Sequence, residues 1–129
     1  MNNAYEKVKE FHKAFEHPTA EHPTPLTDER IKKRATWMAE EIIELAQAQD
    51  VVEQADALAD IMYFCLGTFV EMGVKPEAIF NMVHKANMAK LFPDGKVHKE
   101  GTKTIKPPGW TGPEMGIHHE IKHQRGDFN

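Results

Sequence analysis

Residues 40–60 contain seven carboxylates and no positively charged residue, although this run lies within two apolar helical patterns. An α-helix advances about 100° and about 1.5 Å per residue, so Glu41 and Glu44 share one face, and Asp56 and Asp60 share another. Two unit charges about 5 Å apart repel by about 3 kcal/mol at an effective dielectric near 20. Because a divalent cation would remove this repulsion, the run predicts a metal site between two helices.

Helical periodicity covers most of the chain before residue 92. The expected helices span residues 2–16, a segment from the N-cap Thr27 to near Gln49 or Asp50, a third to Met72 before Gly73, and a fourth from Pro76 to about Leu91. The clearest apolar stripe consists of Ile31, Ala35, Met38, Ile42 and Leu45. Residues 57–70 are apolar nearly all round, which is typical of a helix surrounded by protein.

These patterns predict an all-α fold, a helical bundle of about four helices completed by dimerisation, with a loop-rich C-terminal segment. We expect no strand. The domain covers residues 1–110, where the Lys-, Gly- and Pro-rich end is at best an ordered loop, and residues 111–129 form a flexible tail.

Size and composition indicate one ordinary globular domain. The 129 residues are 40% hydrophobic and 28% charged, with a net charge of −4. The negative charge argues against binding to nucleic-acid polymers or to anionic membranes. A single cysteine fits a reducing compartment, and the chain shows neither a signal-peptide pattern nor an apolar run of membrane-spanning length. We therefore expect a cytoplasmic protein.

The acids indicate which metal to expect, because carboxylate oxygens are hard ligands that suit Mg²⁺ or Mn²⁺. Glu53 lies roughly 10 Å along the helix axis from Asp60, so it could serve only a neighbouring ion. The alternative is that some of these acids are merely solvated. Iron is a weaker interpretation, because Glu120 and His123 form a lone Glu-x-x-His, whereas a di-iron bundle uses two such motifs on core helices.

A lysine-rich segment follows the acidic one. Between positions 85 and 106 the sequence has two acids and six lysines, namely Lys85, Lys90, Lys96, Lys99, Lys103 and Lys106. A metal ion and lysine side chains can together neutralise the charges of a polyphosphate. The alternative is that these lysines belong to a solvated loop. Asn87 and Lys90 are one turn apart and could contact the same ligand. Phe11 and His12 could contact a nucleotide base, although aromatic residues at helical spacing more often form a core.

Glu-Glu-x-x-Glu occupies residues 40–44, Asp-Ala-Leu-Ala-Asp occupies residues 56–60, and Asn-Met-Ala-Lys occupies residues 87–90. Together these motifs resemble the all-α nucleoside triphosphate pyrophosphohydrolase superfamily, in particular its phosphoribosyl-ATP pyrophosphohydrolase-like and MazG-like branch. The likeness extends over roughly residues 5–110. It implies a homodimer or dimer of dimers and Mg²⁺-dependent cleavage between the α- and β-phosphates, which releases a nucleoside monophosphate and pyrophosphate.

The resemblance also implies residue roles. Metal ligands would be Glu41, Glu44 and Asp60, with Asp56 as a further one; Glu40 would bind metal or orient the attacking water; and Asn87, Lys90 and Lys106 would bind phosphates. We take Glu40 and Glu41 as the catalytic residues. Phe11 and His12 are expected as further substrate contacts.

The superfamily pattern continues with Glu-x-x-Asp, and here its first position is Ala57, which cannot bind metal. Either Asp56 takes over one position earlier, or the ion has fewer ligands, or Glu53 and Asp56 form the motif after a shorter gap. We expect house-cleaning of a noncanonical or deoxyuridine nucleotide. The alternatives are a non-catalytic regulatory dimer that binds metal or nucleotide, and a ferritin-like oxidoreductase.

Overall fold

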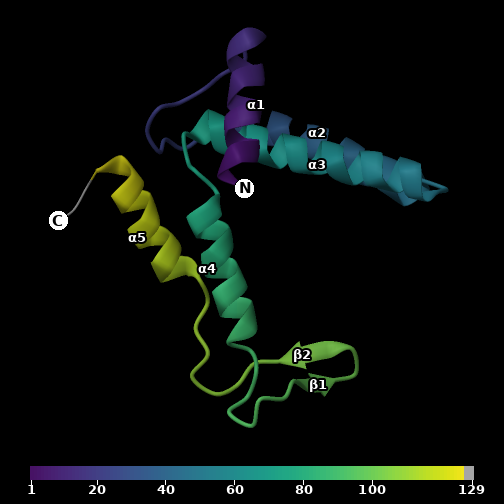
Figure 1. The fold of residues 1–129 in the computed structure, drawn as a ribbon, viewed down its shortest axis with the longest axis vertical. Coiled ribbons are helices and arrows are strands. Elements are labelled where there is room, and N and C mark those ends of the chain that lie inside the picture. The colour runs from purple at the N-terminus through teal and green to yellow at the C-terminus, as the bar shows by residue number, and fades with distance from the viewer. Residues whose placement is uncertain (127–129) are drawn as a thin grey trace. The chain divides into compact units, whose positions relative to one another are not determined.

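The computed structural model describes residues 1–126, which form five helices and one short hairpin (Figure 1). The helices are α1 (Asn2–Ala14), α2 (Asp28–Gln47), α3 (Val51–Met72), α4 (Glu77–Met88) and α5 (Glu114–Arg125). The expected all-α class is confirmed. The chain divides into two compact units, Met1–Pro76 and a second unit that begins at Glu77.

In the first unit α2 and α3 lie side by side along their length, and α1 packs against α3 (Figure 1). The core contains Tyr5 and Val8 of α1 and Val70 of α3, each at most 2% exposed, with Leu66 and Phe69 packed against them. This arrangement covers α3 from two sides and places its acidic residues opposite those of α2.

Local capping interactions determine where α2 and α3 begin and end. The Thr27 side chain accepts a hydrogen bond from Arg30 N at 3.2 Å, and the Asp50 side chain accepts one from Glu53 N at 2.8 Å. Gly73 ends α3 with a φ of 69°, a left-handed conformation that glycine adopts without a steric penalty. The expected start at Thr27, break near Asp50 and stop at Gly73 are confirmed.

The apolar stripe that we expected to be buried on α2 is largely open. Ile31 is 40% exposed and Ile42 is 54% exposed, whereas Arg34 is the buried residue of this helix. On α3, Leu58 and Met62 are 50% and 61% exposed, so protein does not surround that helix in the single chain. The single chain therefore does not bury these stripes, because each helix of this pair covers only part of its neighbour.

The second unit corrects our expectation of irregular structure after α4. Strands β1 (His98–Glu100) and β2 (Lys103–Ile105) pair antiparallel, with Lys99 opposite Thr104. We expected no strand because three-residue strands are too short to show an alternating pattern. Residues 114–125, expected to be a flexible tail, form α5, which packs against α4 and ends at Gly126 with a φ of 82°. The domain boundary after residue 110 stays a prediction.

Within residues 1–126, no single helix has both the length and the apolar character needed to cross a membrane, although α3 and α4 meet that criterion when counted together as one broken segment.

Candidate active site

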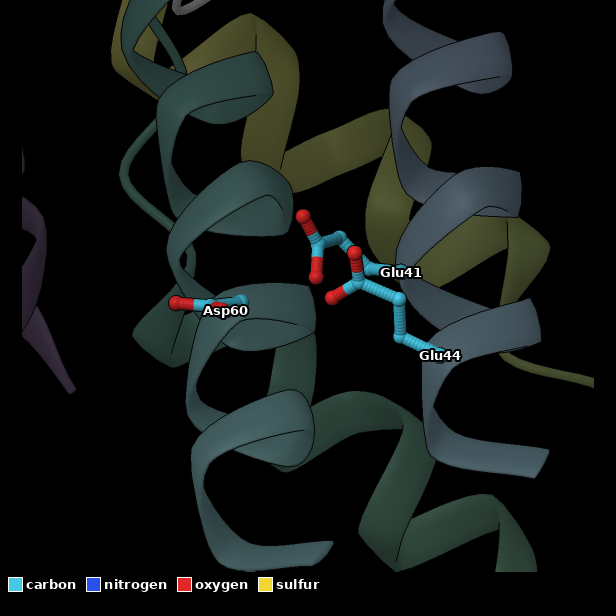
Figure 2. Close-up of side chains that lie close together, drawn as sticks. All are labelled: Glu41, Glu44 and Asp60. Carbon is cyan, nitrogen blue, oxygen red and sulfur yellow. The ribbon is translucent and has the colours of Figure 1, made fainter. Parts of the chain in front are cut away.

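Three carboxylates converge between α2 and α3. Glu41 and Glu44 come from α2 and Asp60 from α3, and one oxygen of each lies within 4.8 Å of the corresponding oxygens of the other two. Figure 2 shows the two glutamate side chains extending from α2 towards the helix that carries Asp60. The spacing of three residues brings the two glutamates to one face. The packing of α2 on α3 then adds the aspartate, which the sequence places 16 positions further along.

The electrostatics of this cluster are unfavourable without a cation. Oε2 of Glu41 is buried and has no hydrogen-bond partner among the described residues. Burial raises the pKa of Glu41, and so do its hydrogen bond with Glu44 and the charges of Glu44, Asp60 and Asp56. Burial also raises the pKa of Asp60, with smaller contributions from Asp56 and Glu44. Each acid thus makes its neighbours harder to ionise.

The donor set fits a divalent metal ion. Buried charges in proteins are normally paired or coordinate a metal, and the unpartnered oxygen of Glu41 is such a group. Mg²⁺ binds oxygen ligands at about 2.0–2.1 Å, so two oxygens on one ion lie within about 4.2 Å of each other. The observed limit of 4.8 Å is slightly wider. Small side-chain rotations of Glu41, Glu44 and Asp60 would close the difference.

The fold distinguishes the two acids that could replace the one missing at Ala57. Glu53 belongs to the start of α3, where its Oε2 accepts a hydrogen bond from Gln49 N at 2.8 Å and its own N–H donates to Asp50. These two bonds resemble a capping box, except that Glu53 reaches the N–H of the residue before the N-cap Asp50. Asp56 instead lies close enough for its charge to raise the pKa of both Glu41 and Asp60. Asp56 is therefore the acid whose charge acts on the cluster, and its role as a metal ligand stays a prediction.

A pocket of about 280 Å³ adjoins the cluster at the end of α2 and the start of α3. Its lining comprises Glu44, Gln47, Ala48, Glu53, Asp56 and Ala57. Ala57 is only 5% exposed. Glu40, which we predicted to be catalytic, is exposed and lies outside the three-carboxylate cluster. Its predicted role therefore depends on the resemblance alone.

A buried arginine fixes the pairing of α2 and α3, and sequence reasoning did not identify it. Arg34 Nη1 lies 2.8 Å from Oε2 of Glu71, and the same guanidinium donates to Thr68 Oγ1 and to the carbonyl oxygen of Phe64. A Cβ at Gly67 would lie 2.5 Å from Arg34 Nη2, so glycine leaves the space that the guanidinium occupies. Arg34 precedes Glu41 by about two turns on α2. This network therefore fixes the position of α2 along the axis of α3, and with it which acids of the two helices lie opposite one another.

The aromatic residues predicted to contact a base lie elsewhere in the first unit. Phe11 packs against Phe15 and Tyr63, with ring centroids 4.7 and 5.6 Å away. His12 is only 2% exposed, and its Nδ1 lies 2.8 Å from the carbonyl oxygen of Pro18. The structure brings neither Phe11 nor His12 into the carboxylate cluster. His12 lies in the interior of the first unit. The substrate-binding role of Phe11 and His12 stays a prediction.

The predicted phosphate-binding residues belong to the second unit. Asn87 and Lys90 line a pocket of about 410 Å³ together with Met88, Leu91, Val97 and Thr104. Lys106 lies just after β2, and its Nζ is 4.6 Å from the centroid of the Trp110 ring. The Nζ atom of Lys90 lies 5.6 Å from the same centroid. The two lysines that we singled out from six thus meet at one aromatic ring.

Comparison with known proteins identifies the family. The model of the phosphoribosyl-ATP pyrophosphohydrolase family matches residues 8–87. A crystal structure of a candidate NTP pyrophosphohydrolase from Exiguobacterium sp. 255-15 is similar to this chain, with 35% identity, a TM-score of 0.55 and 98% of each chain covered. None of the curated proteins compared matches the chain. The family match includes all of the cluster acids, and the chain belongs to the phosphoribosyl-ATP pyrophosphohydrolase family of nucleotide pyrophosphohydrolases.

Proposed function

We propose that this protein hydrolyses a nucleoside triphosphate between its α- and β-phosphates and releases a nucleoside monophosphate and pyrophosphate. The observation that carries the proposal is the convergence of Glu41, Glu44 and Asp60, with a buried Glu41 oxygen that has no hydrogen-bond partner among residues 1–126. The family match and the structural relative support the reaction class.

Glu41, Glu44 and Asp60, with Asp56 beside them, would bind Mg²⁺, and Mn²⁺ could take its place. When bound, the metal supplies positive charge that lowers the pKa of a coordinated water and offsets negative charge on the phosphates. Glu41 would also accept a proton from the attacking water. Glu40, exposed one residue earlier, would orient that water. A new P–O bond forms while the bond to the bridging oxygen breaks, and pyrophosphate leaves.

We further propose that Asn87, Lys90 and Lys106 bind the phosphates of the substrate. The pocket lined by Asn87 and Lys90 and the convergence of the two lysines at one ring support this assignment. We favour a noncanonical or deoxyuridine triphosphate as substrate, with house-cleaning as the role.

A homodimer or dimer of dimers is also part of the proposal. Several large apolar side chains of α2 and α3 are more than half exposed in the single chain, among them Ile43 at 57%, Val51 at 78% and Met62 at 61%. Exposed apolar surface of this kind is typical of protein–protein contacts. A second copy of the chain would cover it.

Pyrophosphate release from a panel of nucleoside triphosphates that includes dUTP, measured with Mg²⁺ or Mn²⁺, tests the reaction. Asp60→Asn is expected to lower turnover by more than about 100-fold, because even residues behind the ligands cost about 10- to 100-fold. Glu10→Gln, on the exposed surface of α1, removes the same charge and should leave turnover within about twofold. No release by the wild-type protein from any member of the panel would refute the reaction and favour a regulatory, non-catalytic dimer.

A further inference from the structure

The indole of Trp110 is the meeting point of two cationic side chains in the second unit. Lys90 approaches it from the end of α4, and Lys106 approaches from the end of β2, with Nζ-to-centroid distances of 5.6 and 4.6 Å. Neither ammonium group has an ion pair or a side-chain hydrogen bond within the described part of the chain. Two like charges drawn to one ring without a carboxylate favour binding of an anion.

The local structure explains how Trp110 reaches this position. Pro107, Pro108, Gly109 and Trp110 form a turn in which Trp110 N donates to the Pro107 carbonyl oxygen at 3.1 Å. Gly109 has a φ of 80°, which a turn with proline at its second position and glycine at its third requires. The turn folds the ring back beneath Lys106, only four residues earlier in the chain.

The ring is also tied to α4. Nε1 of Trp110 donates to the carbonyl oxygen of Ala86 at 2.8 Å. Ala86 lies in the last turn of α4, where carbonyl oxygens have no partner within the helix. This bond fixes the orientation of the indole relative to the helix end from which Lys90 extends. A single side chain therefore connects the helix, the turn and both lysines.

We propose that Trp110 is a positioning residue that gathers Lys90 and Lys106 into one binding site for the phosphate chain of the substrate. The inference rests on the proposed function and extends it to a residue outside the family match, which ends at residue 87. Trp110 itself does not contact the phosphates. It holds the two ammonium groups at one place, and so reduces the entropy that flexible lysine side chains lose when an anion binds.

Calorimetric titration of the full chain with inorganic tripolyphosphate, in EDTA to exclude metal, isolates this site. Trp110→Leu removes both the aromatic face and the N–H donor, and should weaken binding by at least about fivefold, as the loss of two exposed cation–π contacts implies. Trp110→Phe keeps the face and should retain part of the affinity. In turnover, the leucine variant should raise KM while kcat stays within about twofold. Unchanged affinity in Trp110→Leu overturns the proposal.

Lysine variants keep the test decisive if the leucine variant does not fold. Lys90→Gln and Lys106→Gln should each weaken tripolyphosphate binding, whereas Lys99→Gln, an exposed position on β1, removes the same charge and should not. Equal effects of all three substitutions would indicate a general charge effect and overturn the proposal.

Fluorescence gives a readout that a purely structural role would not change. The chain has two tryptophans, so Trp37→Phe leaves Trp110 as the sole indole reporter. Tripolyphosphate should change the Trp110 emission because it brings negative charge to the two ammonium groups that stay beside the ring, and binding without such a change contradicts the proposal. If the wild type hydrolyses no triphosphate yet binds tripolyphosphate through Trp110, only the proposed function fails. If it hydrolyses triphosphates and Trp110→Leu binds tripolyphosphate normally, only this inference fails.

Discussion

Glu41 and Asp60 lie on different helices, yet a carboxylate oxygen of one lies within 4.8 Å of a carboxylate oxygen of the other. Both residues have a raised pKa, with burial as the largest cause. The arrangement is unfavourable in the metal-free protein and becomes favourable when a cation is present. Several measurable properties of the protein depend on this relationship.

Replacing Glu41 by Gln should raise the thermal unfolding midpoint of the metal-free protein, because the substitution removes the repulsion between this carboxylate and Glu44, Asp56 and Asp60. The same change should weaken Mg²⁺ binding by more than about tenfold. Thermal denaturation in EDTA and calorimetric titration with Mg²⁺ measure the two effects. A midpoint that falls, together with unchanged Mg²⁺ affinity, would contradict a metal site here.

Asp56 and Glu53 should respond differently to loss of charge. Asp56→Asn is expected to weaken Mg²⁺ binding, whereas Glu53→Gln should leave it within about twofold, because the Glu53 side chain caps α3. Glu53→Ala should lower the free energy of unfolding by about 1 kcal/mol, because it removes the acceptor of the Gln49 N–H. Calorimetry and urea denaturation measure these quantities. The reverse order of metal affinities would favour the register that contains Glu53.

The buried ion pair between Arg34 and Glu71 should contribute strongly to stability. Both oxygens of Glu71 are paired with arginines, and its side chain is fully buried. Glu71→Gln should lower the free energy of unfolding by about 3–5 kcal/mol, because it leaves a buried cation without its partner. The control is Glu21→Gln at the exposed pair with Lys9, which should cost less than about 1 kcal/mol. Similar costs in urea denaturation would contradict this view of the α2–α3 contact.

His12 should make the protein less stable in mild acid. Burial lowers its pKa below the ordinary 6.5, although the Pro18 carbonyl opposes the shift. The unfolded chain therefore binds a proton before the folded one does, so the His12 contribution to stability is lost as pH falls through 6.5 towards the lowered pKa. NMR titration of the His12 ring should give a midpoint below 6.5, and His12→Asn should reduce the acid sensitivity of urea denaturation. A midpoint at or above 6.5 would disprove the prediction.

The exposed apolar surface of α2 and α3 should mediate self-association. Ile43→Glu is expected to convert the proposed dimer or tetramer to monomer, because the new charge would have to be buried in the contact. Asn3→Glu, at an exposed polar position of α1, should leave the assembly intact. Light scattering after size-exclusion chromatography measures the mass. A wild-type protein that is monomeric at micromolar concentration would rule out the proposed assembly.

The sequence by itself determined the helical class and the main helix boundaries, because caps such as those at Thr27, Asp50 and Gly73 depend on residues within four positions of one another. It also determined that Glu41 and Glu44 share a face, since helical geometry alone sets that spacing. The hairpin and α5 were missed because their local patterns are short or polar.

Only the tertiary structure decided which acids lie close together. The choice between Asp56 and Glu53 depends on a capping bond at Glu53 and on the packing of α2 against α3. Tertiary structure also decided that Arg34 contacts Glu71 and that Lys90 and Lys106 converge at Trp110. The partners in these contacts are between four and 37 positions apart in the sequence. Periodicity describes neighbours along one helix, whereas a binding site is made by side chains from different segments, and their packing alone determines which of them meet.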